Sequence, residues 1–450
     1  MNILKAGFAR VNIDPPMGIA IGGYFVPRHA EQILDDIEIN ALALEVGDRR
    51  IVMLSMDQCG MLTPIVTDFR QHVSQVTGVE LENIFLHATH SHTTPLMSQT
   101  SEDPLDREYY QFVRRRMCDV ASFALADLKP ARMGWGVGNS HRVSFVRRYR
   151  MKDGTVRTNP GIGNPDVLHP VGEVDERVNV LRFDREGADT IVLVNFGCHP
   201  DTIGGNNISA DWPGMLRRTV EQAIDNTKCL FFNGAQGDVG TGNVFAKGGD
   251  MNDLTRQFDN VFRGYGHTRH IGRVIAGAVM QIYDKVNYVD VDRLASLQKV
   301  VKAPSNMPKP EEMEQAHKYA QLHNDGHDDQ IPYTGMELTT VVAEALRMVR
   351  LEHGPEHFEL TLSGLAIGPV AFLGIPGEPF NGVGLGLKKA QGWDMILPCC
   401  QANGREGYFP MMDSYEEGGY EARSSAYKAG IAELLTQEGT AVLDGMRDMK

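Results

Sequence analysis

The chain has 450 residues, of which 42% are hydrophobic and 23% are charged, a composition typical of a globular protein with a large core. Acidic residues outnumber basic ones by 58 to 44, and the net charge of −14 argues against nucleic acid or an anionic membrane as a partner, because both favour a basic face. No run of about 18 or more apolar residues occurs, so no membrane span is predicted.

The N-terminus and the cysteines indicate the compartment. The first residues contain no apolar h-region and are followed by Pro15 and Pro16, so we do not interpret them as a signal peptide. The six cysteines are scattered, mostly in apolar stretches, without C-x-x-C spacing, which predicts reduced core thiols and neither a disulfide framework nor a thiolate zinc site. Together these features predict a cytoplasmic protein.

A βαβ-like unit is predicted near the N-terminus. Residues 39–46 and the nearly continuous apolar run at 51–57 are typical of strands, the second one covered on both faces. Thr63 is expected to cap a helix that has Pro64 in its first turn and Gly78 just past its end. A further apolar strand then leads into a histidine-rich stretch.

The rest of the chain alternates between expected helices and strands. Apolar residues three and four apart predict a long amphipathic helix at 106–128. The segment 146–166 is polar, basic and rich in Gly, Pro and Asn, and we interpret it as a long functional loop. The other expected elements are strands at 134–143, 190–197 and 229–233, helices from near Pro213 (capped by Asp211), at 271–286, from Pro310, at 336–349 and at 425–437, and a hairpin of strands 357–362 and 365–375 turning at Ser363 and Gly364.

Polar segments rich in small residues follow six of the apolar strands. Ligands bind outside the carboxyl ends of strands in open α/β sheets, so six such exits imply one shared site. We therefore expect a single α/β domain over residues 1–450, with a mixed, largely parallel sheet and covering helices. The glycine-rich exit at 234–242 lacks the Lys and Ser/Thr of a P-loop, so no nucleotide cofactor is predicted. The ionisable residues at these exits are Asp57, His92, His199, Asp201, Asp238, Glu378, Arg405 and Tyr408.

Residues 83–95, NIFLHATHSHTTP, place three histidines directly after an apolar strand. Residues two apart in an extended chain point the same way, so His90 and His92 can face one cavity. Imidazole is the commonest protein ligand of zinc, and this pair therefore predicts a zinc site. The alternative is a surface loop that happens to be rich in histidine and threonine.

A series of motifs is similar to the catalytic region of the neutral, non-lysosomal ceramidase family. They are THSHTTP at 89–95, FGCHP at 196–200 followed by ISADWPG at 208–214, NGAQGDV at 233–239, IPGE at 375–378 and GYFPMMDSYEEGGYEARSS at 407–425. The similarity extends from near the N-terminus to near the C-terminus. It implies one ceramidase-like catalytic domain.

Carried over residue by residue, the resemblance implies zinc ligands at His90, His199, Glu378 and Tyr408. Two imidazoles, a carboxylate and a phenol would leave Zn²⁺ room for water or substrate, which distinguishes a catalytic site from a closed structural one. Bound zinc can lower the pKa of its water toward about 7 or polarise a substrate oxygen.

The resemblance also implies active-site roles for three hydrogen-bond donors. They are His92, Tyr420 and an arginine that we assign to Arg147, with its neighbour Arg148 as the alternative. These groups can stabilise developing negative charge. From the residues alone, Asp57 and Asp238 are candidates either for orienting the histidines or for capping a turn, and we include Asp238 among the catalytic candidates.

One departure from the family bears on the substrate. Where the ceramidases carry a serine after GDV, this chain has Gly240, so the group proposed to attack or stabilise the amide is absent. With the polar segment 146–166, this points to a polar small-molecule substrate, hydroxyl-rich or anionic, such as a sugar derivative, in place of ceramide.

Three functions remain open. The first is a zinc-dependent hydrolase in which metal-activated water replaces the serine and attacks an amide or related bond. The second is a metal-assisted lyase or isomerase acting on a carbohydrate derivative, with His92 or Tyr420 moving the proton. The third is a non-catalytic sugar- or lipid-binding protein on the same scaffold. No oligomeric state is predicted.

Overall fold

The computed structural model describes residues 3–245 and 264–449, so 1–2, 246–263 and 450 of the predicted domain lie outside the described part. Within that part the largest sheet has nine strands, in the order β16-β14-β13-β8-β1-β5-β6-β7 with β18 beside β8. Its strands are β1 (Lys5–Asn12), β5 (Glu38–Val46), β6 (Arg49–Met56), β7 (Ile84–Ala88), β8 (Lys129–Asn139), β13 (Arg177–Arg185), β14 (Thr190–Phe196), β16 (Thr227–Asn233) and β18 (Asn287–Val289).

A second sheet of four strands packs face to face on the first. Its order is β19-β20-β21-β23, and a shared apolar core joins the two sheets. Ile51 and Met53 of β6 lie in this core, whereas Val52 and Leu54 belong to the core on the opposite face. Successive strand residues point to opposite faces, so a strand covered on both sides has the continuous apolar sequence seen here. The four strands are β19 (Leu294–Pro304), β20 (His357–Ile367), β21 (Val370–Gly374) and β23 (Met395–Cys399).

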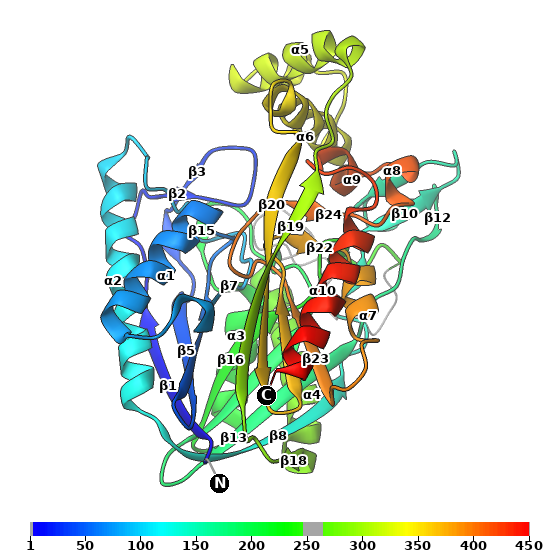
Figure 1. Cartoon of the computed structure of the whole chain (residues 1–450). Coiled ribbons are helices and arrows are strands. Elements are labelled where there is room, and N and C mark those ends of the chain that lie inside the picture. Colours follow the sequence, from blue (N-terminus) through cyan, green and yellow to red (C-terminus); the bar gives the residue numbers. More distant parts are fainter. Residues whose placement is uncertain (1–2, 246–263, 450) are drawn as a thin grey trace.

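Helices cover the outer faces of both sheets and complete four layers (Figure 1). On the larger sheet, α1 and α2 pack over β1, β5 and β7, while α3 and α4 pack over β8, β13 and β16. On the second sheet, α10 and α7 form the cover. The pair α5 and α6 stands beyond the upper end of the sheets, and both chain ends lie at the lower end (Figure 1). The helices are α1 (Thr63–Thr77), α2 (Pro104–Ala126), α3 (Asp211–Ala223), α4 (Tyr265–Ile282), α5 (Met313–Asn324), α6 (Gly335–Leu351), α7 (Asn381–Leu387), α8 (Ser414–Glu417), α9 (Tyr420–Ser424) and α10 (Ile431–Asp448).

The mixed α/β class is confirmed, but the expectation of a largely parallel sheet is corrected. In the two main sheets only β6–β7, β14–β16 and β21–β23 pair in parallel among the described strands, and the other pairs are antiparallel. These three pairs contain the six strands whose exits carry the predicted polar segments. The carboxyl ends within each pair point the same way, which brings two exits together at each of three places.

The segment 146–166 is not the long loop expected from its composition. Its residues contribute to a small antiparallel sheet of β10 (Arg148–Met151), β11 (Val156–Thr158) and β12 (Val167–Pro170). In addition, β9 (Phe145–Val146) pairs with β17 (Val239–Gly240). Strands this short, joined by turns with glycines at positive φ such as Gly154 and Gly163, give no readable apolar period.

The predicted hairpin turn at Ser363 and Gly364 is wrong, because β20 runs straight through both residues to Ile367. The turn lies at Gly368, which has a φ of +55° and joins β20 to β21. Gly364 instead permits close packing of α10, since a Cβ there would lie 2.7 Å from the Met446 Cε and Val442 Cγ1 atoms.

Two helix starts also differ from the expectation. The helix predicted at 425–437 is α10, which begins only at Ile431 because Gly430 precedes it in the left-handed conformation. The N-cap of α1 is Leu62 and not Thr63, whose hydroxyl donates to Glu406. No described helix combines the length and the apolar character needed to cross a bilayer. The single-domain organisation and the cytoplasmic location stay predictions.

Candidate metal centre

Three of the predicted zinc ligands converge where the parallel strand pairs end. Glu378 Oε2 lies 3.2 Å from His90 Nε2 and 3.1 Å from His199 Nε2. The three side chains are buried, with exposed fractions of 2% for each histidine and 5% for Glu378. They follow β7, β14 and β21 respectively, so ligands more than a hundred residues apart meet at one point.

Backbone carbonyls fix the tautomer of both histidines. His90 Nδ1 lies 2.5 Å from the Cys59 oxygen, and His199 Nδ1 lies 2.9 Å from the Gln236 oxygen and 3.0 Å from the Val239 oxygen. A carbonyl only accepts hydrogen bonds, so each Nδ1 carries the proton and each Nε2 presents its lone pair to Glu378. Fixing one ring nitrogen in this way is the usual means of preparing the other for a metal.

The resulting arrangement lacks a positive partner at its centre. Although Glu378 Oε2 lies close to both Nε2 atoms, it makes no hydrogen bond of acceptable geometry with any residue that the structure describes. With both rings neutral, two lone pairs and a carboxylate oxygen face one another in a buried place, which is unfavourable unless a proton or a metal cation lies between them. Tetrahedral zinc with bonds of about 2.0–2.1 Å holds its ligand atoms about 3.3 Å apart, close to the separations seen. The residues fit a divalent metal.

A proton on His90 is the competitor of such a metal. Burial lowers the pKa of His90, but Glu378 and Cys59 together outweigh this effect and raise that pKa to about 10. For His199, burial and then the charge of Arg147 lower the pKa to about 4, so that ring is neutral at pH 7. The centre therefore offers one neutral imidazole, one imidazole that must release a proton, and one carboxylate.

The backbone at His90 is strained. Its φ of +76° lies in the left-handed region, which side chains other than glycine rarely adopt. His90 N donates to the Gln58 oxygen at 2.8 Å, and Thr89 N donates to the Met56 oxygen at 2.9 Å, so neighbouring segments hold the residue in this conformation. Strain of this kind persists where the surrounding structure requires it, commonly at functional sites.

Tyr408, the fourth predicted ligand, lies beside this cluster. It is the register partner of Glu378 where β22 (Glu378–Pro379) pairs in parallel with β24 (Tyr408–Phe409). Its ring stacks on His199, with centroids 6.5 Å apart and an interplanar angle of 17°. Burial raises the pKa of the Tyr408 hydroxyl, and Glu378 raises it further. The hydroxyl therefore stays protonated at neutral pH.

His92 and Tyr420 lie at the partly exposed side of the cluster. His92 Nε2 is 3.2 Å from His90 Nε2, and its Nδ1 is a buried atom with no hydrogen-bond partner in the described part of the chain. The Tyr420 ring packs edge-on against Tyr408, with centroids 5.6 Å apart. Both residues therefore flank the three buried side chains.

Arg147, and not its neighbour Arg148, is the arginine of the cluster. Its Nη1 lies 3.2 Å from His199 Nε2, and its Nη2 donates to the Gly237 oxygen at 2.7 Å. Because an arginine can only donate, the first contact also assigns the lone pair of His199 to Nε2. Arg148 points to Glu417, 3.0 Å away. The positions of the two side chains therefore place Arg147 in the cluster and Arg148 outside it.

The predicted acceptors Asp57 and Asp238 are occupied elsewhere. Asp57 forms a two-pronged ion pair with the buried Arg217, at 2.9 and 2.6 Å. Asp238 Oδ1 accepts from the backbone N–H of Asn381 at 2.7 Å and so caps the start of α7. Backbone carbonyls orient the two histidines in place of these carboxylates. Every residue type has a backbone carbonyl, so the sequence could not indicate which residues accept these hydrogen bonds.

Two further residues support the cluster without having been predicted. Glu421 is fully buried, lies 2.8 Å from Arg147 Nη2 and accepts from Thr158 Oγ1 at 2.7 Å. Asp211 opens α3 at a φ of +54° as its first residue, not as the predicted cap. Its carboxylate accepts from Thr202 N and Ile203 N at 2.8 and 3.1 Å, which fixes the loop after His199. In the sequence, only the adjacency of Glu421 to the predicted active-site residue Tyr420 could have indicated its role.

Gly240 packs directly on the arginine of the cluster. A Cβ at this position would lie 3.0 Å from Arg147 Cδ and 3.1 Å from Arg147 Cγ. Any side chain there, including the serine of the ceramidase motif, would press on Arg147. The glycine and the present position of the arginine are therefore coupled.

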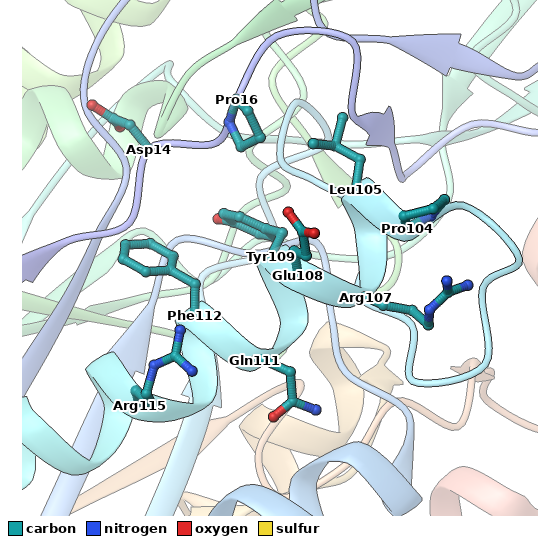
Figure 2. A pocket seen from close by; sticks show the side chains of 10 residues that line it. All are labelled: Asp14, Pro16, Pro104, Leu105, Arg107, Glu108, Tyr109, Gln111, Phe112 and Arg115. Carbon is teal, nitrogen blue, oxygen red and sulfur yellow. The ribbon is translucent and has the colours of Figure 1, made fainter.

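Among the cavities lined by described residues, two bear on the search for a substrate site. One of about 700 Å³ sits on the outer face of α2, between its first turns and the segment of Asp14 and Pro16 (Figure 2). Its lining contains Tyr109, Phe112 and Arg115 but, among the described residues, no histidine or cysteine. The other, about 560 Å³, lies between β11, the start of α6 and the segment before Tyr420. Of these two, the second adjoins the candidate site, because Thr158 in its wall contacts Glu421 and Tyr420.

Comparisons with known proteins identify the fold. The chain matches no model of a protein family and no curated protein. Among solved structures, the neutral ceramidase from Pseudomonas aeruginosa aligns with a TM-score of 0.75 and 18% identity, over 100% of this chain and 75% of that chain. A structure described as a ceramidase complexed with C2 aligns with a TM-score of 0.73 and 17% identity, over 100% and 76%. The resemblance inferred from the motifs is thus confirmed at the level of the fold, which is that of the ceramidases.

Proposed function

We propose that this protein is a zinc-dependent hydrolase that cleaves an amide or related bond of a polar small molecule. One observation carries the proposal: the Nε2 atoms of His90 and His199 lie 3.2 and 3.1 Å from a buried carboxylate oxygen of Glu378 that has no hydrogen-bond partner among the described residues. Two nitrogens and one oxygen form the ligand set of several catalytic zinc sites. When bound, zinc would lower the pKa of water toward about 7 and polarise a substrate oxygen.

The remaining residues of the cluster are suited to stabilising charge and moving protons. Arg147 is held by Glu421 and by the Gly237 oxygen, so its guanidinium is preorganised to donate to negative charge that develops on the substrate. Tyr420, whose pKa burial raises, stays protonated and can donate in the same way. His92 has a free Nδ1 and is the candidate for transferring a proton to the leaving group.

A polar substrate is favoured over ceramide. Gly240 replaces the serine of the ceramidase motif, and the cavity beside Tyr420 presents polar side chains, among them Arg157, Asn159 and Asn164, over about half of its wall. Thr158 in its wall hydrogen-bonds both Glu421 and the backbone N–H of Tyr420. A long apolar chain would find few partners in such a lining.

A second candidate is a metal-assisted lyase or isomerase acting on a carbohydrate derivative. The observation in its favour is the buried, unpartnered Nδ1 of His92 beside Tyr420, since proton abstraction and return need two such groups. The two candidates differ in mass balance, because hydrolysis adds one water to the products whereas elimination and isomerisation do not.

The test combines metal analysis with product analysis. The purified chain is stripped with a chelator, reloaded with zinc and assayed for metal by elemental mass spectrometry. It is then incubated with a panel of N-acylated and O-acylated sugars and amino acids, and products are identified by mass. Glu378→Gln and His199→Ala should lose zinc, whereas His357→Ala, at an exposed position that begins β20, should keep it.

Three results separate the candidates. One zinc per chain and products heavier by one water support the hydrolase. One zinc per chain with products of unchanged total mass would favour the lyase or isomerase. A chain that takes up no zinc and binds a panel sugar unchanged would overturn both and favour a binding protein.

A further inference from the structure

Arg405 lies on the segment that also positions the candidate metal ligands. The segment runs from the end of β23 to Tyr408, and it is held by Glu406 N donating to the Pro376 oxygen at 2.9 Å. Glu378 N in turn donates to the Gly407 oxygen at 2.8 Å. The backbone that presents Glu378 and Tyr408 therefore also presents Arg405.

The side chain of Arg405 runs toward the cluster. Its stem packs on Gly60, where a Cβ would lie 2.6 Å from Arg405 Cδ and 2.9 Å from Gln401 Oε1. Gly60 follows Cys59, whose carbonyl holds His90 Nδ1. Cys59 raises the pKa of Arg405 most strongly, burial opposes this, and Glu378, Tyr408 and Tyr420 add to the rise. The Arg405 guanidinium therefore interacts electrostatically with the same groups that surround the candidate metal ligands.

Arg405 differs from the other arginines near the cluster in having no partner. Arg147, Arg148 and Arg217 each pair with a carboxylate at 2.6–3.0 Å. Arg405 makes no hydrogen bond and no ion pair with any residue in 3–245 or 264–449, although it is only partly exposed. A guanidinium held beside a buried cluster without a counter-ion is costly, and such residues commonly bind a ligand.

The charge balance of the cluster points to an anion. Arg147 and Arg405 face the carboxylates of Glu378 and Glu421, and Asp201 acts on His92 as a third negative charge. A bound divalent cation would add two positive charges to the two arginines and outweigh these three carboxylates, within a chain of net charge −14. Negative groups are attracted to such a place, and a planar guanidinium binds a carboxylate through two parallel hydrogen bonds.

We propose that Arg405 is the residue that recognises an anionic oxygen group of the substrate, a carboxylate or a sulfonate-like group, while the opposite end of the substrate meets the metal ligands. This inference rests on the proposed zinc-dependent function and narrows its substrate class to anionic molecules. Arg405 binds and orients the substrate and takes no part in bond breaking. Its fork geometry makes lysine a poor replacement.

The probes are hydroxamic acids, whose hydroxamate group binds zinc. Monohydroxamates of succinic, glutaric and adipic acid carry a free carboxylate at increasing distance, and their matched counterparts carry an isopropyl group in its place. A third series carries a terminal sulfonate. Dissociation constants are measured by titration calorimetry on the zinc-loaded full chain, for the original sequence and for Arg405→Gln, Arg405→Lys and Arg115→Gln. Arg115, on the exposed face of α2, lines the distant cavity of Figure 2 and controls for loss of net charge.

We expect one carboxylate or sulfonate probe to bind roughly tenfold or more tightly than its isopropyl counterpart, because a charge-assisted bidentate contact is worth that much. Arg405→Gln should abolish this preference, Arg405→Lys should retain part of it, and Arg115→Gln should leave it unchanged. The isopropyl probes should bind all four chains alike, which also shows that each variant is folded and holds zinc.

Two results overturn the inference in distinguishable ways. If all probes bind zinc-loaded chain but the charged ones show no preference that depends on Arg405, the anion subsite is wrong while the metal centre stands. If the chain holds no zinc and binds no hydroxamate, the proposed function has failed and the subsite with it.

Discussion

Glu378→Gln tests the metal centre most directly. Glutamine has the shape of glutamate, so the pairing of residue 378 with Tyr408 and the surrounding burial are preserved. The substitution removes the charge that faces His90 Nε2 and His199 Nε2 at 3.2 and 3.1 Å. We expect zinc affinity to fall by about a hundredfold or more, because the neutral glutamine side chain has the shape of glutamate but is a weak zinc ligand without the anionic oxygen.

The size of the effect follows from the chain length. A ligand at a hundred times its Kd stabilises the folded state by about 2.7 kcal/mol. An unfolding entropy of about 2.1 cal/mol/K per residue gives roughly 0.9 kcal/mol/K for 450 residues, so zinc should raise the Tm by about 3 °C. With affinity reduced a hundredfold, the same zinc concentration equals the Kd, the gain is about 0.4 kcal/mol and the shift is under about 1 °C.

The assay is thermal unfolding with zinc or with chelator, followed by fluorescence, with zinc content measured in parallel. Glu80→Gln, which removes the same charge at an exposed site, is the control and should keep the full shift. A zinc shift in Glu378→Gln equal to that of the original chain would mean that this carboxylate is not a ligand, and the reasoning about the cluster would fall.

Three further substitutions test the supporting structure. Gly364→Ala should destabilise the chain by about 1–3 kcal/mol by overpacking against α10, whereas Gly277→Ala, which meets no atom within 4 Å in α4, should be neutral or stabilise it by up to about 1 kcal/mol in urea unfolding. Glu421→Gln should cost roughly 2–3 kcal/mol of unfolding free energy, because Arg147 loses its buried counter-charge. Burial raises the pKa of both Asp238 and Asp211 from 3.8 to about 6, so the folded state binds extra protons and stability should fall as pH rises from about 4 to 6. Asp238→Asn should reduce that slope, leave the part due to Asp211 and keep zinc affinity. Loss of zinc in this variant would restore a direct role for the Asp238 carboxylate.

The layered fold and the convergence of the ligands could be read from the sequence because both follow from burial. Strands covered on both faces have continuous apolar runs, and β6 was recognised by that property. His90, His199 and Glu378 each follow such a run, and each of the three parallel strand pairs brings two such exits together. The position of Gly78 after α1, at a φ of +74°, followed from helix termination in the same way.

The predictions that were wrong, and the residues that were missed, have a different origin. Gly364 was interpreted as a turn residue, yet its role is to admit the side chains of α10, a tertiary requirement that a single sequence does not reveal. The strands of the small sheet at 145–170 are two to four residues long, too short for a period. Glu421 gave no sign of its burial, because an acidic residue next to a tyrosine has no pattern that distinguishes an internal ion pair from a solvated surface.

Each parallel strand pair supplies both a candidate ligand and the group that holds it. In the pair β6–β7, the residue after one strand gives His90 and the Cys59 oxygen after the other accepts from its Nδ1. In β14–β16, His199 is held by the Gln236 and Val239 oxygens. In β21–β23, the backbone N–H of Glu378 donates to the Gly407 oxygen. Ligand and anchor leave the sheet side by side, so the register of each pair sets the geometry of the centre. Other residues on the same exits, such as Gly240 and Arg405, lie outside the ligand set and are free to serve substrate recognition.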